Sequence, residues 1–444
     1  MRNRREQEGS ATILALFVLV LMTGMALALL FVADSDVKAN QAGGRSKRAF
    51  FFAEAGLEDA RTQLAANNLA SANPSSLDDE LTTAAGANGI INFDVNTLAP
   101  TYDSNGNVTG FTGYGDDAPL RASTSFGGGW YAAFVTNDPI DVQAGRPLDD
   151  TNDRVLVTAI GAGPDRSVEI VQAIVERTTV PALPATITML GPPPTDFQGG
   201  GSGAKTYIGD DCVGATGYTG VPGLSVPVVG GIGSTSEGAL ATDVTTKGGT
   251  YSSDGQSGGN IVDDLTTTSD PIWTEVIDPL WRDCAYLHTL AQVMKSSADY
   301  VRTPSSPCNH WSTSTITTVT YVEGDLSLGS TDDGKGILWV TGQLHVRGST
   351  NWEGAIFVVG TGNFLRDGGG NGKTIGAMLL ANDAGPDGIY GNSDDCTGPG
   401  PDPGMSPAQF MTSGGGNHDT IYCSDAINQA FNGLPIEVVT FRQH

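Results

Sequence analysis

The chain has 444 residues, a formal net charge of −26 and a pI of about 4.3. So acidic a chain lacks the basic face with which proteins bind nucleic acid, and this class of partner is excluded. Glycine (60 residues) and proline (23 residues) are abundant, whereas charged residues make up only 16% of the chain. This composition is typical of turn-rich β structure rather than of an acidic disordered tail, and the length predicts two or three domains.

A long uncharged segment lies close to the N-terminus. Residues 11–33 carry no charged side chain, and a helix of that length extends about 34 Å, more than the hydrocarbon core of a bilayer at about 30 Å. The alternative is a cleaved secretory signal, but its apolar core would be shorter. We therefore expect a retained membrane helix. The flanking Lys and Arg residues do not set its orientation, whereas cysteines in the acidic remainder favour a location outside the cytoplasm.

The helical pattern continues past this apolar segment. Apolar residues recur at helical spacing from Ala49 to Leu64, and polar positions among them are occupied by Glu54, Glu58, Asp59 and Arg61. The pattern predicts one helix over residues 10–66. Its first half is apolar on all sides and its second half is amphipathic.

Two blocks of this region resemble a known family. The segment QEGSATILALFVLVLMTGMALALLF and the block RAFFFAEAGL at 48–57, which contains Glu54, are similar to the N-terminus of PilX-type minor pilins of type IV pili. They also resemble the K-type minor pseudopilin of type II secretion. The resemblance covers about 60 of the 444 residues. It implies that prepilin peptidase removes residues 1–9 as a leader by cutting after Gly9, so that Ser10 becomes the first residue.

The resemblance also implies partners and a location. The partners would be other pilins and inner-membrane pilus assembly proteins. The chain would cross the inner membrane once with its N-terminus in the cytoplasm, and it would reach the pilus or cell surface after assembly. One position departs from the family pattern, because major pilins carry Glu at the fifth mature position and Leu14 stands here. Leu14 offers no carboxylate to pair with a neighbour's terminal amine, which favours a first-placed or tip subunit.

The middle of the chain has the pattern of a sheet. Residues 67–180 are polar and loop-rich at first and then contain three runs with period two, at 130–135, 154–160 and 168–175. Such β-branched and aromatic runs predict an antiparallel β-meander that packs on the amphipathic half of the helix, as in a pilin. A Pro-rich linker is expected at 181–198.

The C-terminal part, residues 199–444, contains internal repeats. The sequence GGGNGKTI at 368–375 returns as GGGNHDTI at 414–421, and short apolar runs begin at Gly336, Gly354 and Gly376. Short strands at steps of about 20 residues predict a short parallel β-helix, with a β-sandwich of Gly-rich hairpins as the alternative. Apolar residues at helical spacing predict one helix within 272–301. The expected fold class is α+β, with a mainly β C-terminal domain.

One acidic loop has the spacing of a calcium site. Asp383, Asp387 and Asp394 stand at the first, fifth and twelfth places of a twelve-residue loop, with Gly388 at the sixth. Carboxylates at this spacing wrap one ion in calcium-binding loops. The alternative is an Asx-rich turn without an ion. Calcium is the one cofactor that the sequence suggests.

Five cysteines lie in the C-terminal part, at 212, 284, 308, 396 and 423. The absence of a C-x-x-C pair argues against zinc, and disulfides are expected outside the cytoplasm. Proximity in sequence favours Cys396 with Cys423 and Cys284 with Cys308. No catalytic motif occurs, so we expect no enzyme activity. A polysaccharide-cleaving β-helix is the alternative, which would need Asp and Arg side chains, such as those at 347, 366 and 367, on one face.

These patterns lead to two hypotheses about function. The first is a minor-pilin-like structural subunit of a type IV pilus or related secretion filament, which displays a large extracellular domain at or near the tip. The second is a membrane-tethered adhesin or ligand-binding module at the cell surface.

Overall fold

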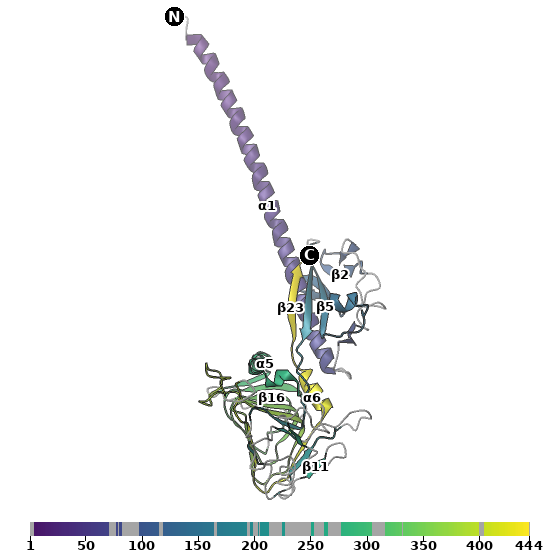
Figure 1. Ribbon diagram of the computed structural model, residues 1–444. Helices are drawn as coiled ribbons and strands as arrows, with labels where there is room; N and C mark the ends of the chain where they lie inside the picture. Colours follow the sequence, from purple (N-terminus) through teal and green to yellow (C-terminus); the bar gives the residue numbers. More distant parts are fainter. Residues whose placement is uncertain are drawn as a thin grey trace. The chain divides into compact units, whose positions relative to one another are not determined.

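The computed structural model describes residues 4–70, 77–78, 80–81, 97–114, 119–163, 167–192, 196–198, 203, 205–212, 224–226, 250–252, 262–264, 277–303, 316–330, 332–398 and 404–443 (Figure 1). The protein is of mixed α+β class, with one long N-terminal apolar helix and a mainly β C-terminal region. It divides into two compact units. The first contains Met1–Leu64, Leu77–Glu176 and Val438–His444, and the second contains Ala65–Ser76 and Arg177–Glu437. In chain order, the second unit is therefore inserted ahead of the last strand of the first.

Helix α1 (Arg4–Ala70) forms the predicted long helix. Its segment from Leu14 to Asn67 is long and apolar enough to cross a membrane. Towards its C-terminal end, one stripe is buried at three- and four-residue spacing: Ala49, Phe52, Ala53, Leu57, Ala60 and Leu64. This amphipathic stripe packs within the first unit, whereas the apolar side chains from 14 to 32 are exposed.

The first unit contains an antiparallel sheet. Its strands are β3 (Arg121–Phe126), β4 (Gly129–Asn137), β5 (Arg154–Ala162), β6 (Val168–Arg177) and β23 (Ile436–Gln443), in the order β23-β6-β5-β4-β3. The pairs β4–β5 and β5–β6 are antiparallel, as the period-two runs predict, and β3, which the sequence analysis did not predict, pairs antiparallel with β4. Figure 1 shows the yellow C-terminal strand β23 beside the blue strands of this unit. The unit also contains the antiparallel hairpin β1 (Ala99–Tyr102) and β2 (Val108–Thr112), and the short helix α3 (Pro139–Gln143).

A glycine allows α1 to lie directly on this sheet. A Cβ on Gly161 of β5 would overlap the carbonyl oxygen of Ala49 and the amide nitrogen of Ala53. The backbones of helix and strand therefore approach more closely here than any other residue would permit.

The second unit is built from parallel strands in two sheets. The larger sheet contains β7 (Ile187–Met189), β9 (Lys205–Ile208), β10 (Leu224–Val226), β11 (Thr250–Ser252), β12 (Val262–Asp264), β13 (Tyr300–Arg302), β14 (Thr318–Val322), β16 (Gly334–Val340), β18 (Asn351–Gly360), β20 (Gly372–Asn382) and β22 (His418–Ile421). The smaller sheet contains β8 (Asp196–Gln198), β15 (Leu326–Leu328), β17 (Leu344–Arg347), β19 (Asn363–Asp367) and β21 (Gln409–Thr412). From β14 to β22 the chain alternates between the two sheets, and each strand lies parallel to the one before it in the same sheet.

The central strands of the larger sheet are buried on both faces. One face packs against the smaller sheet and contributes Leu338, Val340, Ile356, Val358, Met378 and Leu380. The other face packs under helices α5 (Cys284–Ser296) and α6 (Ser424–Phe431) and contributes Ile337, Trp339, Ala355, Phe357, Ala377 and Leu379. This two-sided burial explains why these strands read as continuous apolar runs rather than as alternating ones.

Side chains of the same type stack from one strand to the next. The rings of Phe364 and Phe410 lie 4.8 Å apart, and those of Phe410 and Phe197 lie 5.0 Å apart, all nearly parallel. On the other face, Trp339 stacks on Phe357 at 5.1 Å. These columns follow the parallel register and add to the burial of large apolar side chains.

The observed boundaries differ from the predicted ones. The expected linker at 181–198 contains β7 and β8, which pair with β20 and β21, so it belongs to the second unit. The last residues of the expected 199–444 domain belong to the first unit. The helix expected within 272–301 begins only at Cys284, because Asp283 caps it by accepting from the backbone amides of Ala285 and Tyr286. The 3-10 helix Pro279–Arg282 precedes it.

Candidate functional site

A polar groove of about 550 Å³ lies on the second unit. Helix α5 forms one wall with Gln292 and Lys295, and residues 388–391 of the long loop after β20 form the other. The floor consists of residues at or just beyond the ends of strands β14, β16 and β18: Tyr321, Glu323, Gly324, Asp325, Thr341, Gly342 and Thr361. Parallel pairing brings these strand ends together at one edge of the sheet.

The groove combines charged groups with hydroxyls. Lys295 forms an ion pair with Glu323, and its Nζ also lies 5.9 Å from the ring centre of Tyr321. The hydroxyls of Thr361 and Tyr390 are buried and have no hydrogen-bond partner in the part of the chain that the structure describes. Burial raises the pKa of Tyr321 to about 12 and raises the pKa of Tyr390 as well, so both phenols are neutral donors at pH 7. Such a lining suits a polar ligand better than an apolar one.

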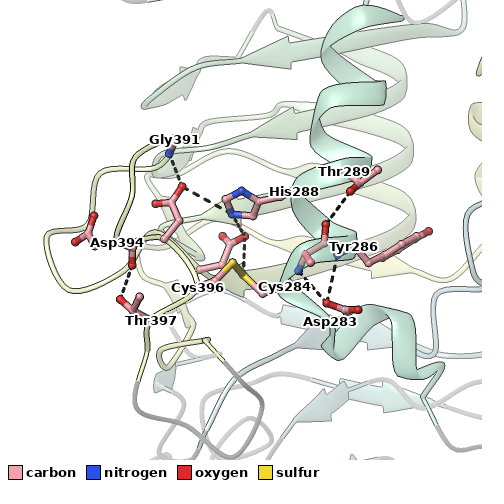
Figure 2. Close-up of a disulfide and its surroundings, with 12 residues drawn as sticks. Asp283, Cys284, Tyr286, His288, Thr289, Gly391, Asp394, Cys396 and Thr397 are labelled. Atoms are coloured by element: carbon pink, nitrogen blue, oxygen red, sulfur yellow. Dashed lines mark hydrogen bonds and ion pairs between the residues drawn. A yellow bond between two sulfur atoms is a disulfide. The ribbon is translucent and has the colours of Figure 1, made fainter.

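The two walls are joined at one end (Figure 2). A disulfide links Cys284 of α5 to Cys396 of the loop. Beside it, Nε2 of His288 lies 3.2 Å from Oδ2 of Asp383 and 3.8 Å from Oδ2 of Asp395. The carboxylate of Asp383 raises the pKa of His288, whereas burial raises the pKa of Asp383. This cluster holds the loop against α5.

The three expected calcium ligands have different surroundings in the structure. Asp383 is fully buried and directed at His288. Asp387 is exposed, and its two oxygens accept from the amide of Ile389 and the side-chain amide of Asn392. Figure 2 shows Asp394 on the outer side of the loop, away from the histidine. The loop thus uses its carboxylates to stabilise its own turns. Calcium binding stays a prediction, and it would require the loop to rearrange.

The expected disulfide pairing is wrong. Cys212 pairs with Cys423 and Cys284 pairs with Cys396, across 211 and 112 residues. Parallel packing brings residues together that are far apart in sequence, so proximity along the chain was a poor guide. Cys308 lies outside the described residues.

The remaining sequence candidates do not form a catalytic cluster. Arg366 is buried and donates from Nη2 to the carbonyl oxygen of Gly348. Its neighbour Asp367 instead pairs with His345 at 3.0 Å and with Arg347 at 3.6 Å. Successive residues of β19 point to opposite faces, so Arg366 and Asp367 cannot act on one substrate atom.

The N-terminal candidates lie on α1. Gly9 and Ser10 are in its first turns, and Glu54 is half-buried in its amphipathic half. Asp59 was expected only as a polar position of this helix, and the sequence reasoning missed its contacts with the sheet. Its Oδ2 accepts from Nε of Arg121 at 2.6 Å and from the hydroxyl of Tyr131 at 2.8 Å. The position of Asp59 on the buried side of an amphipathic helix was the available signal.

No family model, curated protein or solved structure matches this chain.

Proposed function

We propose that the protein is a minor-pilin-like structural subunit of a type IV pilus or related secretion filament, of the PilX type. Its first unit is then a pilin-like domain, and its second unit is a short β-solenoid displayed at or near the filament tip. The observation that carries this proposal is helix α1, whose apolar half is exposed among the described residues and whose amphipathic half packs on an antiparallel sheet.

The apolar half needs an apolar environment. Large apolar side chains from Leu14 to Val32 are between 48% and 72% exposed. With 67 residues, α1 extends about 100 Å, and only its C-terminal part packs in the first unit. Apolar surface on this scale marks a membrane or protein interaction site. In our proposal it lies first in the inner membrane, with the N-terminus cytoplasmic, and later among the helices of other pilins.

Leu14 supports a place at the filament end. A subunit with Leu at this position cannot form an ion pair with the terminal amine of the subunit ahead of it. Its apolar helix face can still pack among the subunits behind it. The inserted second unit, residues 177–437, would also hinder close repetition along a shaft. We infer low copy number, processing by prepilin peptidase, and a structural rather than an enzymatic role.

The groove favours a second candidate function. Thr361 and Tyr390 line it, and within the described residues their buried hydroxyls have no hydrogen-bond partner, so a small side-chain movement would let them bind a polar ligand. A membrane-tethered adhesin or ligand-binding module would use this groove without forming part of a filament.

The N-terminus separates the two candidates. Mass spectrometry of the chain purified from membranes of its native host should find Ser10 as the first residue, and the variant Gly9→Val should retain Met1. An intact Met1 in the functional wild-type protein would contradict the filament proposal and leave the tether.

Labels on the second unit should mark filament ends, and regular spacing along the shaft would contradict the tip placement. The variant Leu14→Glu should not improve assembly, because an unpaired carboxylate in an apolar core costs several kcal/mol or takes up a proton.

A further inference from the structure

Four metal-binding side chains converge where the loop meets α5 (Figure 2). Cys284 and His288 are one turn apart on the same face of α5, Asp383 directly follows β20, and Cys396 lies further along the same loop. Oδ2 of Asp383 lies 3.2 Å from Nε2 of His288 and 4.0 Å from Sγ of Cys284. Sγ of Cys284, Sγ of Cys396 and a ring nitrogen of His288 all lie within 4.8 Å of one another.

One oxygen of the buried Asp383 carboxylate lacks a partner among the described residues. Asp383 is 0% exposed, and within the described residues its Oδ1 has no hydrogen-bond partner. The neighbouring disulfide has no proton to donate, and His288 reaches only Oδ2. Burial of a carboxylate next to apolar sulfur is costly unless a proton or a cation compensates it. This unsatisfied oxygen is independent of the cysteines and also indicates a cation.

We propose that Cys284, His288, Asp383 and Cys396, when the two cysteines are reduced, bind one thiophilic divalent cation of the Zn²⁺ type. Two thiolates, one imidazole and one carboxylate are a donor set that zinc accepts in tetrahedral geometry. At metal–ligand distances of about 2.0–2.3 Å, tetrahedral ligands lie about 3.3–3.8 Å apart. The contacts of Asp383 with His288 and Cys284 are already close to this spacing. Breaking the disulfide bond lets the two sulfur atoms separate, and Asp383 must also approach Cys396, since it is not part of the group of three side chains that lie within 4.8 Å of one another.

The disulfide and the metal site exclude each other. A thiol or phosphine reductant supplies two electrons and is itself oxidised, and with two protons from water the disulfide becomes two thiols. Binding of the cation then releases both protons as the thiolates form. Exchange with another disulfide removes the two electrons again and expels the cation. A newly synthesised chain carries both thiols, so the site exists before the disulfide forms and needs no reductant at that stage.

The second disulfide provides a matched control. Cys212 and Cys423 have a carboxylate beside them, that of Asp211, but no imidazole in their cluster. Asp211 also accepts a hydrogen bond from the hydroxyl of Ser424. The two cysteine pairs therefore share their chemistry except for the histidine and the buried, unsatisfied carboxylate oxygen.

The test uses the full chain in detergent with the background change Cys308→Ser. The protein is reduced with a phosphine under argon, incubated with ZnCl₂, desalted and analysed by inductively coupled plasma mass spectrometry. We expect one zinc per chain, the same in Cys212→Ser/Cys423→Ser, and none in Cys284→Ser/Cys396→Ser or in the unreduced protein. With Co²⁺ in place of zinc, the reduced parent protein and its Cys212→Ser/Cys423→Ser variant should show a thiolate-to-metal charge-transfer band.

The conservative variants His288→Gln and Asp383→Asn test the other two ligands. Each should weaken zinc binding more than about 100-fold in competition with a chromophoric chelator, since even loss of an outer partner of a ligand costs 10–100-fold. Circular dichroism of each oxidised variant checks its fold. The proposal is overturned if reduced wild type takes up no zinc, whether folded or not. It is also overturned if zinc remains without Cys284 and Cys396, or if affinity is unchanged in both conservative variants.

Discussion

His418 donates a hydrogen bond from Nδ1 to the carbonyl oxygen of Gly372, 46 residues earlier in the chain, at 3.1 Å. A carbonyl oxygen can only accept, so the proton of the neutral ring is on Nδ1. Nε2 then accepts from the hydroxyl of Thr420 at 3.0 Å. The side chain is 1% exposed, and burial, with the charge of Arg366 nearby, lowers the pKa of His418 to about 3.

This contact predicts acid sensitivity of the second unit. The unfolded chain protonates His418 near pH 6.5, whereas the folded chain does so only near pH 3. Below about pH 6.5 the unfolded state therefore binds a proton that the folded state does not. The free energy of unfolding falls as the pH is lowered, by about 2 kcal/mol at pH 5 relative to pH 7. Urea unfolding followed by tryptophan fluorescence at pH 7 and pH 5 measures it, because every tryptophan except Trp130 lies in that unit.

Two variants separate this histidine from other titrating groups. His418→Leu should flatten the change in unfolding free energy between pH 7 and pH 5 by about 2 kcal/mol. Thr420→Val should lower stability at both pH values and keep the slope. A His418→Leu protein with the wild-type slope would refute the assignment.

A column of glycines predicts a steric limit on the larger sheet. Gly336, Gly354 and Gly376 lie side by side in the parallel register, each with positive φ. A Cβ on Gly354 would overlap the carbonyl oxygen of Gly336. Gly354→Ala should therefore lower the unfolding free energy of the second unit by more than about 2 kcal/mol. Gly369→Ala is the control, because its Cβ would meet nothing within 4 Å. Equal effects of the two changes would disprove this explanation.

The disulfides predict a specific peptide map. Proteolysis without reduction should yield linked peptides that contain Cys212 with Cys423 and Cys284 with Cys396. Cys308 should then be the thiol that reacts with an alkylating reagent. Loss of either bond through a Cys→Ser change should cost about 2–5 kcal/mol. Recovery of Cys396 linked to Cys423, or Cys284 linked to Cys308, would contradict the structure.

The two hydrogen bonds that Asp59 accepts predict that it stabilises the first unit. Asp59→Ala removes the acceptor of both Arg121 and Tyr131. We expect a loss of about 1–2 kcal/mol, towards the low end because the side chains of Asp59 and Arg121 are 25% and 34% exposed. Glu58→Ala is the matched control on the same helix. Its ion pair with Arg61 is exposed, so the change should cost no more than about 0.5 kcal/mol. Hydrogen exchange of α1 amides after residue 50 measures both, and a larger effect of Glu58→Ala would count against the role of Asp59.

Several elements could be predicted because their pattern is local. The uncharged run and the amphipathic stripe predicted α1, since burial of a helix face follows from spacing along one segment. The runs that begin at Gly336, Gly354 and Gly376 predicted neighbouring strands, and these glycines pair in the observed register. The repeat of 368–375 at 414–421 likewise corresponds to the pairing of Gly372 with His418.

The sequence by itself determined the long helix and the strands whose apolar runs have a clear period or repeat. Only the tertiary structure decided that the last strand, β23, joins the first sheet, and that Cys284 meets Cys396 rather than Cys308. It also turned Asp383 inward to His288, away from the loop carboxylates with which its spacing grouped it. The physical reason is the range of the interactions. Helical and strand periodicity is set within a few residues, whereas these contacts depend on how many parallel strands separate two distant segments and on which edge each segment reaches.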